Sequence, residues 1–275
     1  MQADIDAGAG LGAFLRDRRA RLDPQALGFA SVRRRTPGLR REEVAQRAHI
    51  SATWYTWLEQ GRGGAPSAEV LHRIADALML TADEREHLFL LGLGRLPAVR
   101  YQGAVGVTPR LQHVLDALVG CPAIVKTATW DVVAWNVAAA KVLTDYGALP
   151  PKQRNILRLI FCEPRVRRAQ ADWLASARFV VAAFRADVAR AGAAGECAAL
   201  IEELRQLSPE FGTIWRDQDV RSYGDGTKQL RHAQAGLISF EYSSFVVDGR
   251  PDLAMLVFRP LADKDRAKVD KLLKA

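Results

Sequence analysis

Residues 36–62 have the sequence TPGLRREEVAQRAHISATWYTWLEQGR, which contains two short apolar patterns separated by a tight turn. Apolar residues recur at helical spacing in the first pattern, over 39–48. Ser51 is a natural N-cap for the second pattern, over 52–60, and Gly61 is a natural end for it. The stretch therefore predicts two short helices joined by a turn of three residues, His49, Ile50 and Ser51.

The segments on either side are also predicted to be helical. Leucine and phenylalanine recur at helical spacing over 11–22. Ser67 and Thr81 are natural N-caps for apolar patterns that follow each of them, over 68–80 and 82–93. With the two helices of 36–62, this gives an all-α bundle of five helices.

A change of pattern separates this bundle from the remainder of the chain. Residues 96–108 combine glycine and proline with no clear periodicity, which is typical of a linker. We therefore expect a first domain over 1–95 and a second over 109–275. In the second, helical patterns alternate with β-rich ones, and 237–247 and 252–258 form a predicted hairpin. The predicted fold class is α+β, with the five-helix domain first.

The composition of the chain is typical of a globular protein and not of a membrane or secreted one. The chain has 275 residues, 49% of them hydrophobic, which is enough for two buried cores. There is no apolar run of transmembrane length and no secretory signal pattern at the N-terminus. Cys121, Cys162 and Cys197 are widely spaced and odd in number, as expected of free thiols. We expect a cytoplasmic protein with no membrane partner.

Positive charge is concentrated near the predicted turn. The net charge is +8, and residues 14–62 contain eleven arginines and no lysine against five acids. Arginine forks match phosphates and guanine edges, so this segment favours double-stranded DNA as a partner. On charge alone, a solvated arginine face is the alternative.

Two short helices joined by a tight turn are the parts of a helix-turn-helix, and the residues of this one match a particular family. "EEVA" and "LEQG", with the lead-in "RRTPGLRREEVA", resemble the Xre, or lambda-repressor-like, family and its MmyB-like subgroup over about residues 11–91. The resemblance implies that the helix Ser51–Gln60 lies in the major groove of DNA.

The resemblance also implies a role for individual residues in DNA binding. Trp57 occupies a base-reading position where many relatives have arginine, and its uncharged indole would pack against a sugar or a thymine methyl group instead. The implied contacts are to bases from the reading helix and to the DNA backbone from the arginines. The candidate DNA-binding residues of this motif are Arg41, Ser51, Ala52, Thr53, Thr56, Trp57 and Arg62, with packing against the long loop as the alternative for Trp57. Arg33, Arg34 and Arg35 in the preceding loop are further candidates to reach phosphates, with a solvated loop as the alternative.

A second group of motifs lies in the C-terminal half. "DVVAWN" at 131–136, "RNILRLIF" at 154–161 and "SPEFGTIW" at 208–215 resemble the PAS-like ligand-binding domain of the MmyB-like subgroup. For that subgroup the resemblance implies a small apolar ligand, similar to a fatty acid. A sheet with helices folded over it can enclose an apolar cavity for such a ligand.

Seven residues are candidates to hold the ligand, six from these motifs and Trp173 from a further short match, "DW" at 172–173. Asn155 or Arg158 would meet a polar head group, although a structural ion pair is an equal explanation for Arg158. For each tryptophan, packing in the core is the alternative. The full set is Trp135, Asn155, Arg158, Phe161, Trp173, Phe211 and Trp215.

The chain shows no local motif of catalysis, metal binding or cofactor binding. The five histidines share no motif with cysteine or acids at metal-ligand spacing, and no phosphate-cradling glycine loop is present. We therefore expect no enzyme, metal or cofactor, with a haem on His113 or His232 as a remote alternative. The favoured function is a ligand-responsive transcription regulator that binds a pseudo-palindromic operator as a homodimer. The alternative is a helix-turn-helix protein that acts through protein contacts, with a ligand-free structural C-terminal domain.

Overall fold

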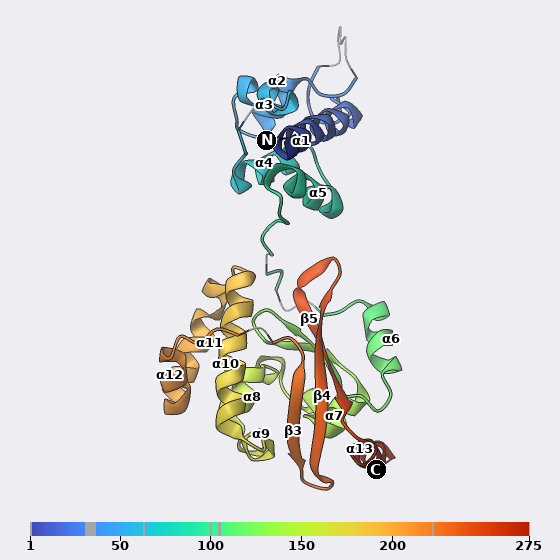
Figure 1. Ribbon diagram of the computed structural model, residues 1–275, viewed down its shortest axis with the longest axis vertical. Helices are drawn as coiled ribbons and strands as arrows, with labels where there is room; N and C mark the ends of the chain where they lie inside the picture. The colour runs from blue at the N-terminus through green and yellow to red at the C-terminus, as the bar shows by residue number, and fades with distance from the viewer. Residues whose placement is uncertain are drawn as a thin grey trace. The chain divides into compact units, whose positions relative to one another are not determined.

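The computed structural model describes residues 2–30, 37–62, 64–99, 101–103, 106–221 and 223–274, with backbone alone for 2–9. The chain divides into two compact units, Met1–Pro97 and Ala98–Ala275. The first is helical and the second combines helices with a five-stranded sheet (Figure 1). The predicted α+β class, with the helical region first, is confirmed. Within the described residues, no helix combines the length and apolar character needed to cross a membrane.

The N-terminal unit contains five helices among its described residues. They are α1 (Gln2–Arg21), α2 (Arg41–Arg47), α3 (Ala52–Glu59), α4 (Ala68–Ala77) and α5 (Ala82–Leu93). The predicted caps are present: the side chains of Ser51, Ser67 and Thr81 accept backbone N–H bonds of 3.1, 3.3 and 3.3 Å. The first helix begins at Gln2, well before the predicted start at residue 11.

Helix α1 packs closely against the C-terminal end of α3. A Cβ on Gly12 would lie 2.4 Å from the carbonyl oxygen of Glu59, so only glycine allows this approach. The core beneath is filled by fully buried apolar side chains from all five helices. It includes Leu15, Leu39, Val44, Tyr55, Leu58, Leu71, Ile74, Leu88 and Phe89.

A buried carboxylate joins three segments of this unit. Glu59 accepts a 2.5 Å bond from Nε of Arg19 on α1 and a 2.7 Å bond from Nε of Arg41 on α2. Arg19 also donates to the carbonyl of Leu39 at 2.7 Å, just ahead of α2. The Glu59 side chain is 0% exposed, so these bonds take the place of water around its charge.

The C-terminal unit is built on a five-stranded antiparallel sheet. Its strands are β1 (Ala123–Thr127), β2 (Val132–Trp135), β3 (Gly226–His232), β4 (Gly236–Val247) and β5 (Arg250–Pro260). They lie in the order β2-β1-β5-β4-β3. The predicted hairpin is β4 and β5, while β3 was not foreseen, because "GTKQLRH" is mostly polar and only Leu230 in it is fully buried.

The two faces of the sheet are covered differently. Helix α6 (Pro109–Ala117) packs on one face, where Leu115 joins Ala123, Val125 and Leu253. On the other face, Ile124, Leu256 and Phe258 meet side chains from several helices. Figure 1 shows α8 to α12 gathered on this second side. The helices of this unit beyond α6 are α7 (Val137–Val142), α8 (Ile156–Cys162), α9 (Pro164–Ala169), α10 (Trp173–Arg190), α11 (Ala194–Leu207), α12 (Pro209–Arg216) and α13 (Asp263–Lys274).

Asn136 explains the "AWN" motif. Its side-chain oxygen accepts bonds from the backbone of Ala123 at 3.0 Å and Ala139 at 2.9 Å, which ties β1 to the start of α7. Its amide nitrogen lies 2.9 to 3.2 Å from three carbonyl oxygens, one in the last turn of α6 and two in the segment that joins α6 to β1. An amide supplies an acceptor and donors together, so asparagine suits this junction better than a purely apolar or purely acidic residue.

Replacing Glu59 by alanine should destabilise the N-terminal unit by about 3–5 kcal/mol, because it leaves the Arg19 guanidinium buried without a counter-charge. Burial opposes ionisation of Glu59, but the bonds from Arg19 and Arg41 outweigh it and lower its pKa below the ordinary value of 4.5. The contribution of Glu59 is therefore complete at neutral pH and is lost as the pH falls through the lowered pKa. Amide hydrogen exchange followed by mass spectrometry should report faster exchange in α1 and α3.

Glu42 provides the matched control, since it is an exposed glutamate on α2. Glu42→Ala should leave exchange in α1 and α3 unchanged. If both variants exchange at the same rate there, the Glu59 cluster is not what holds these helices together.

Candidate DNA interface and ligand cavity

The turn between α2 and α3 is closed by local backbone geometry. His49 adopts a left-handed conformation with φ of 51°, which ends α2 abruptly. The N–H of Ile50 then reaches back to the carbonyl of Ala45 at 3.0 Å. Ser51 caps α3 directly afterwards, so the two helices are separated by a four-residue connection, from Ala48 to Ser51.

The outward face of α3 carries the residues expected to read bases. Thr53 is exposed, and the side chain of Trp57 is 49% exposed, while Tyr55 is fully buried beneath them. Ala52 and Thr56 are partly exposed, and the Thr56 hydroxyl donates to the Ala52 carbonyl at 2.8 Å. The acid of this helix, Glu59, is turned inward, so α3 presents no carboxylate to a polyanion.

The arginines expected at the DNA backbone have different surroundings. Arg62 is exposed just after α3. Arg41 is held by its bond to Glu59, and its side chain is 38% exposed, so it has a structural role whether or not it also meets DNA. Arg33, Arg34 and Arg35 lie outside the described residues.

The two residues expected to meet a ligand head group form hydrogen bonds within the protein instead. The Asn155 side chain is fully buried; its Nδ2 donates to the Thr129 carbonyl and to Asp131, both at 2.9 Å, and its oxygen caps α8. The Nε of Arg158 donates to Glu203 at 2.9 Å, the ion pair that was the alternative for it. Neither side chain points a free polar group at a cavity.

The expected aromatic lining belongs mainly to the helical core. Phe161 contacts Trp173 and Phe211, with ring centroids 5.7 and 5.1 Å apart, and Phe211 stacks on Trp215 at 5.7 Å. Trp135 lies apart from these four, 5.5 Å from the ring of Tyr146. The structure thus brings four of the seven residues together between α8, α10 and α12, and none of the seven lines the cavity described next.

An apolar cavity of about 70 Å³ lies between the sheet and helices α8, α9 and α10. It adjoins a hollow of about 380 Å³, with which it shares Ile160, Val180, Tyr223 and Lys228. The wall of the smaller cavity is largely aliphatic and aromatic. Its apolar members are Ile124, Leu143, Tyr146, Ile156, Leu159, Ile160, Val166, Ala169, Val180, Leu230, Leu256 and Phe258, with Tyr223.

Lys228 places a cation at this apolar wall. It pairs with buried Phe240 across β3 and β4, so it shares the inner face of the sheet. Its ammonium nitrogen lies 5.7 Å from the centroid of the Phe258 ring and forms no ion pair with any described carboxylate. Burial lowers the pKa of Lys228 to about 8. The lysine is therefore mostly charged at neutral pH, and its side chain is partly shielded from solvent.

Gln170 adds a second polar group to the same wall. Its side chain is 7% exposed, and its Nε2 donates to the Val166 carbonyl at 3.3 Å. Its Oε1 is buried without a hydrogen-bond donor among the described residues. A buried acceptor with no partner is uncommon in proteins and indicates a place where a ligand or a water molecule binds.

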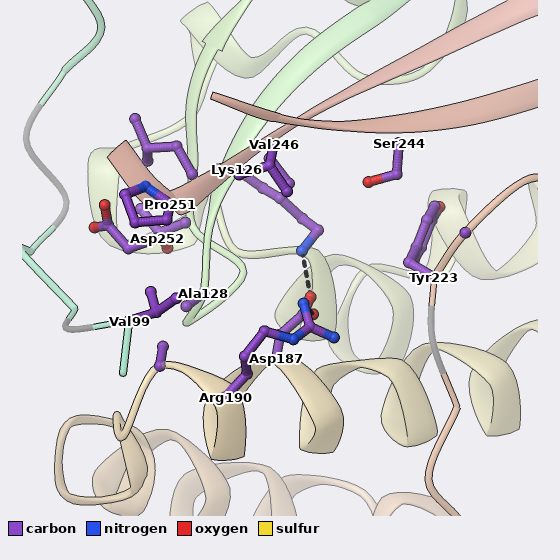
Figure 2. Close-up of a pocket in the computed structure, with 15 residues that line it drawn as sticks. Val99, Lys126, Ala128, Asp187, Arg190, Tyr223, Ser244, Val246, Pro251 and Asp252 are labelled. Atoms are coloured by element: carbon purple, nitrogen blue, oxygen red, sulfur yellow. Dashed lines mark hydrogen bonds and ion pairs between the residues drawn. The ribbon is translucent and has the colours of Figure 1, made fainter. Parts of the chain in front are cut away.

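A separate cavity of about 180 Å³ lies toward the other end of the same face, around Lys126 (Figure 2). Lys126 of β1 points at Asp187 of α10, with 2.7 Å between Nζ and Oδ2. Asp187 also accepts bonds from the indole of Trp130 at 2.9 Å and from Arg190 at 3.2 Å. The charge of Lys126 is therefore compensated within the protein, whereas that of Lys228 is not.

Neither Lys228 nor Gln170 was among the residues singled out from the sequence. A signal for Lys228 was present, because alternation in "GTKQLRH" places Lys228 on the same face as buried Leu230. Gln170 carries no comparable signal. It is brought to the cavity by an isolated bridge to Leu230, a pairing that depends on the tertiary fold.

Comparison with known families matches both units. A family model described as MmyB-like transcription regulator ligand binding domain matches residues 107–272, more than half of the chain. A model described as helix-turn-helix domain matches residues 10–88. No curated protein gives a match. The chain therefore belongs to the MmyB-like transcription regulators, with a helix-turn-helix DNA-binding domain followed by a ligand-binding domain.

Proposed function

We propose that this regulator binds a fatty-acid-like ligand in the cavity between the sheet and helices α8 to α10, with the ligand carboxylate at Lys228. We further propose that the helix-turn-helix binds a pseudo-palindromic operator as a homodimer. The observation that carries the ligand proposal is the uncompensated ammonium of Lys228 at an otherwise apolar wall.

The chemistry of the cavity favours an acid with an apolar chain. A charge surrounded by apolar groups is costly unless a counter-charge or hydrogen bonds compensate it. A carboxylate at Lys228 would supply that compensation, and the aliphatic wall would contact the chain. Gln170 Oε1 would accept a bond from a hydroxyl or water beside the carboxylate.

The volume of the cavity limits how much of the ligand's apolar chain it can hold. A volume of about 70 Å³ accommodates a short apolar segment, and a longer chain would continue into the adjoining hollow of about 380 Å³. Ligand sites in proteins commonly measure about 300–1,000 Å³. A sheet with helices enclosing an apolar space is also the arrangement expected of a PAS-like domain, which supports that description of the C-terminal unit.

The operator proposal rests on the outward face of α3. A single recognition helix contacts only a few base pairs, so specific binding needs a second helix about one turn of DNA away. A homodimer provides this helix. If the ligand binds one form of the dimer better than another, it changes the affinity for DNA, and DNA changes the affinity for the ligand by the same factor.

Lys228→Met should weaken the binding of decanoate about tenfold to a hundredfold, because a hydrogen bond to a charged partner contributes about 1.5–3 kcal/mol. The wild-type affinity should fall as the pH rises above about 8, where the free lysine loses its proton. The slope should approach about tenfold per pH unit. In the variant, the affinity should be flat over this range. Isothermal titration calorimetry on the full-length protein, with acids from hexanoate to tetradecanoate, measures both the affinity and its pH dependence.

Lys271→Met is the matched control, since Lys271 is an exposed lysine on α13. It should leave both the affinity and its pH dependence unchanged. The thermal stability of Lys228→Met should equal or exceed that of the wild type, because a poorly solvated charge has been removed. Identical affinities of wild type and Lys228→Met at every pH would place the carboxylate elsewhere, and no binding of any acid by the wild type would contradict the ligand proposal.

Thr53→Ala combined with Trp57→Ala should abolish preference for an operator selected from random DNA, while binding to unrelated DNA persists. Both side chains are exposed on α3, so the fold should tolerate their loss. Arg62→Ala should instead weaken binding to both kinds of DNA and reduce the slope of log affinity against log salt by about 1. Fluorescence anisotropy over a range of salt concentrations distinguishes the two effects.

Arg110→Ala serves as the control for charge, because Arg110 is exposed on α6 in the ligand-binding unit. Retention of operator preference by the Thr53 and Trp57 double variant would show that another surface reads the DNA. An operator complex containing one copy of the chain, measured by native mass spectrometry, would contradict the homodimer.

A further inference from the structure

A basic groove adjoins the ligand cavity. It has a volume of about 570 Å³ and lies between α7, α9 and the end of β3 that follows Leu230. The cavity and the groove share five wall residues, which are Leu143, Thr144, Val166, Ala169 and Leu230. The two spaces are therefore neighbours, and the same five residues border both.

Cations from separate elements converge on this groove. Lys141 comes from α7, Arg165 and Arg168 come from α9, and Arg231 comes from β3. All four are exposed, and none forms an ion pair with a described carboxylate. Asp145 is the acid of the groove wall, and its Oδ1 accepts backbone bonds from Gly147 at 3.1 Å and Ala148 at 3.4 Å.

Other arginines on α9 and α10 do form ion pairs. Arg167, between two of the groove arginines on α9, pairs with Glu210 at 3.0 Å and lies over the ring of Trp173. Arg178 pairs with Asp217 at 3.2 Å. Arg165 and Arg168 of α9 have no such ion pair among the described residues and line the groove with Lys141 and Arg231, so the groove has the charge of an anion site.

The position of Lys228 relates the cavity to the groove. Lys228 and Leu230 are on the same face of β3, and Arg231 follows Leu230 into the groove. Likewise, Gln170 lines the cavity, while Ala169 and Arg168 just before it line the groove. Leu230 borders both spaces, so a ligand that extends from Lys228 past Leu230 reaches the basic groove.

We propose that the ligand carries a phosphate ester on its apolar chain, with the chain in the cavity and the phosphate in the groove of Lys141, Arg165, Arg168 and Arg231. This rests on the proposed function, in which the cavity holds an apolar chain. One carboxylate needs a single cation, and Lys228 already supplies it. A phosphate monoester carries about −1.5 to −2 charge at neutral pH and several acceptor oxygens, which match arginine forks.

Decyl phosphate and decanoate, which have the same alkyl character and different head groups, test this directly. Calorimetry on the full chain at neutral pH should show that decyl phosphate binds at least about tenfold more tightly than decanoate. Arg168→Glu combined with Arg231→Glu should remove this advantage and leave the affinity for decanoate within about twofold. Decanoyl-coenzyme A and decanoyl-glycerol phosphate, measured in the same way, distinguish the two common sources of such a phosphate.

Arg110→Glu combined with Lys271→Glu is the matched control, because it makes the same change in net charge at exposed positions outside the groove. It should preserve the advantage of decyl phosphate. Equal affinities of the wild type for decyl phosphate and decanoate would overturn the inference while leaving the proposed function intact. No binding of either compound would contradict the proposed function itself.

Two further outcomes would also overturn the inference. Inorganic phosphate that binds as tightly as decyl phosphate would make the groove an anion site unconnected with the cavity. A loss of non-specific DNA affinity in the groove variant, with no change toward decyl phosphate, would assign the four cations to the DNA backbone.

Discussion

The buried carboxylate of Glu59 is the interaction on which the DNA-binding unit depends. It lies at the C-terminal end of α3 and accepts bonds from α1 and α2, so one charge fixes the orientation of the recognition helix relative to both neighbours. Gly12 permits the close approach that these bonds require. The arrangement also turns the acid of α3 inward, away from any polyanion. The same carboxylate therefore stabilises this unit and leaves the outer surface of α3 without an acid.

The ligand-binding unit uses polar side chains in the same way at its junctions. Asn136 joins α6, β1 and α7 through its amide, and Asn155 joins the turn after β1 to the start of α8. Both asparagines belong to motifs by which the sequence resembles the MmyB-like subgroup, "DVVAWN" and "RNILRLIF". Such buried, fully bonded amides specify one packing arrangement, because each alternative leaves a donor or an acceptor unpaired.

Local signals in the sequence were sufficient for the helices and not for the ligand site. Capping serines, Gly61 and apolar periodicity act within one turn of chain, so α2, α3, α4 and α5 were predicted close to their observed bounds. The polar edge strand β3 was missed because its stability comes from pairing with β4 along its full length, a contact that local pattern does not contain. The aromatic residues Phe161, Trp173, Phe211 and Trp215 were candidates to hold a ligand, and they pack on one another, which was the alternative for the tryptophans. The cavity is lined mainly by ordinary aliphatic residues, which have no distinctive pattern.

A cation that is paired with a carboxylate has a structural role, whereas an unpaired cation is available to a ligand. Lys126 is more deeply buried than Lys228, yet its bond to Asp187 satisfies its charge, and the carboxylate is in turn held by Trp130 and Arg190. Arg158 is likewise satisfied by Glu203. Folding energy accounts for these residues without any ligand. Lys228 has no such partner among the described residues, and an apolar residue there would avoid the cost of desolvating a charge. The ligand proposed above would offset that cost at Lys228, and its phosphate would do the same for the cations of the groove, where Asp145 is the acid of the wall.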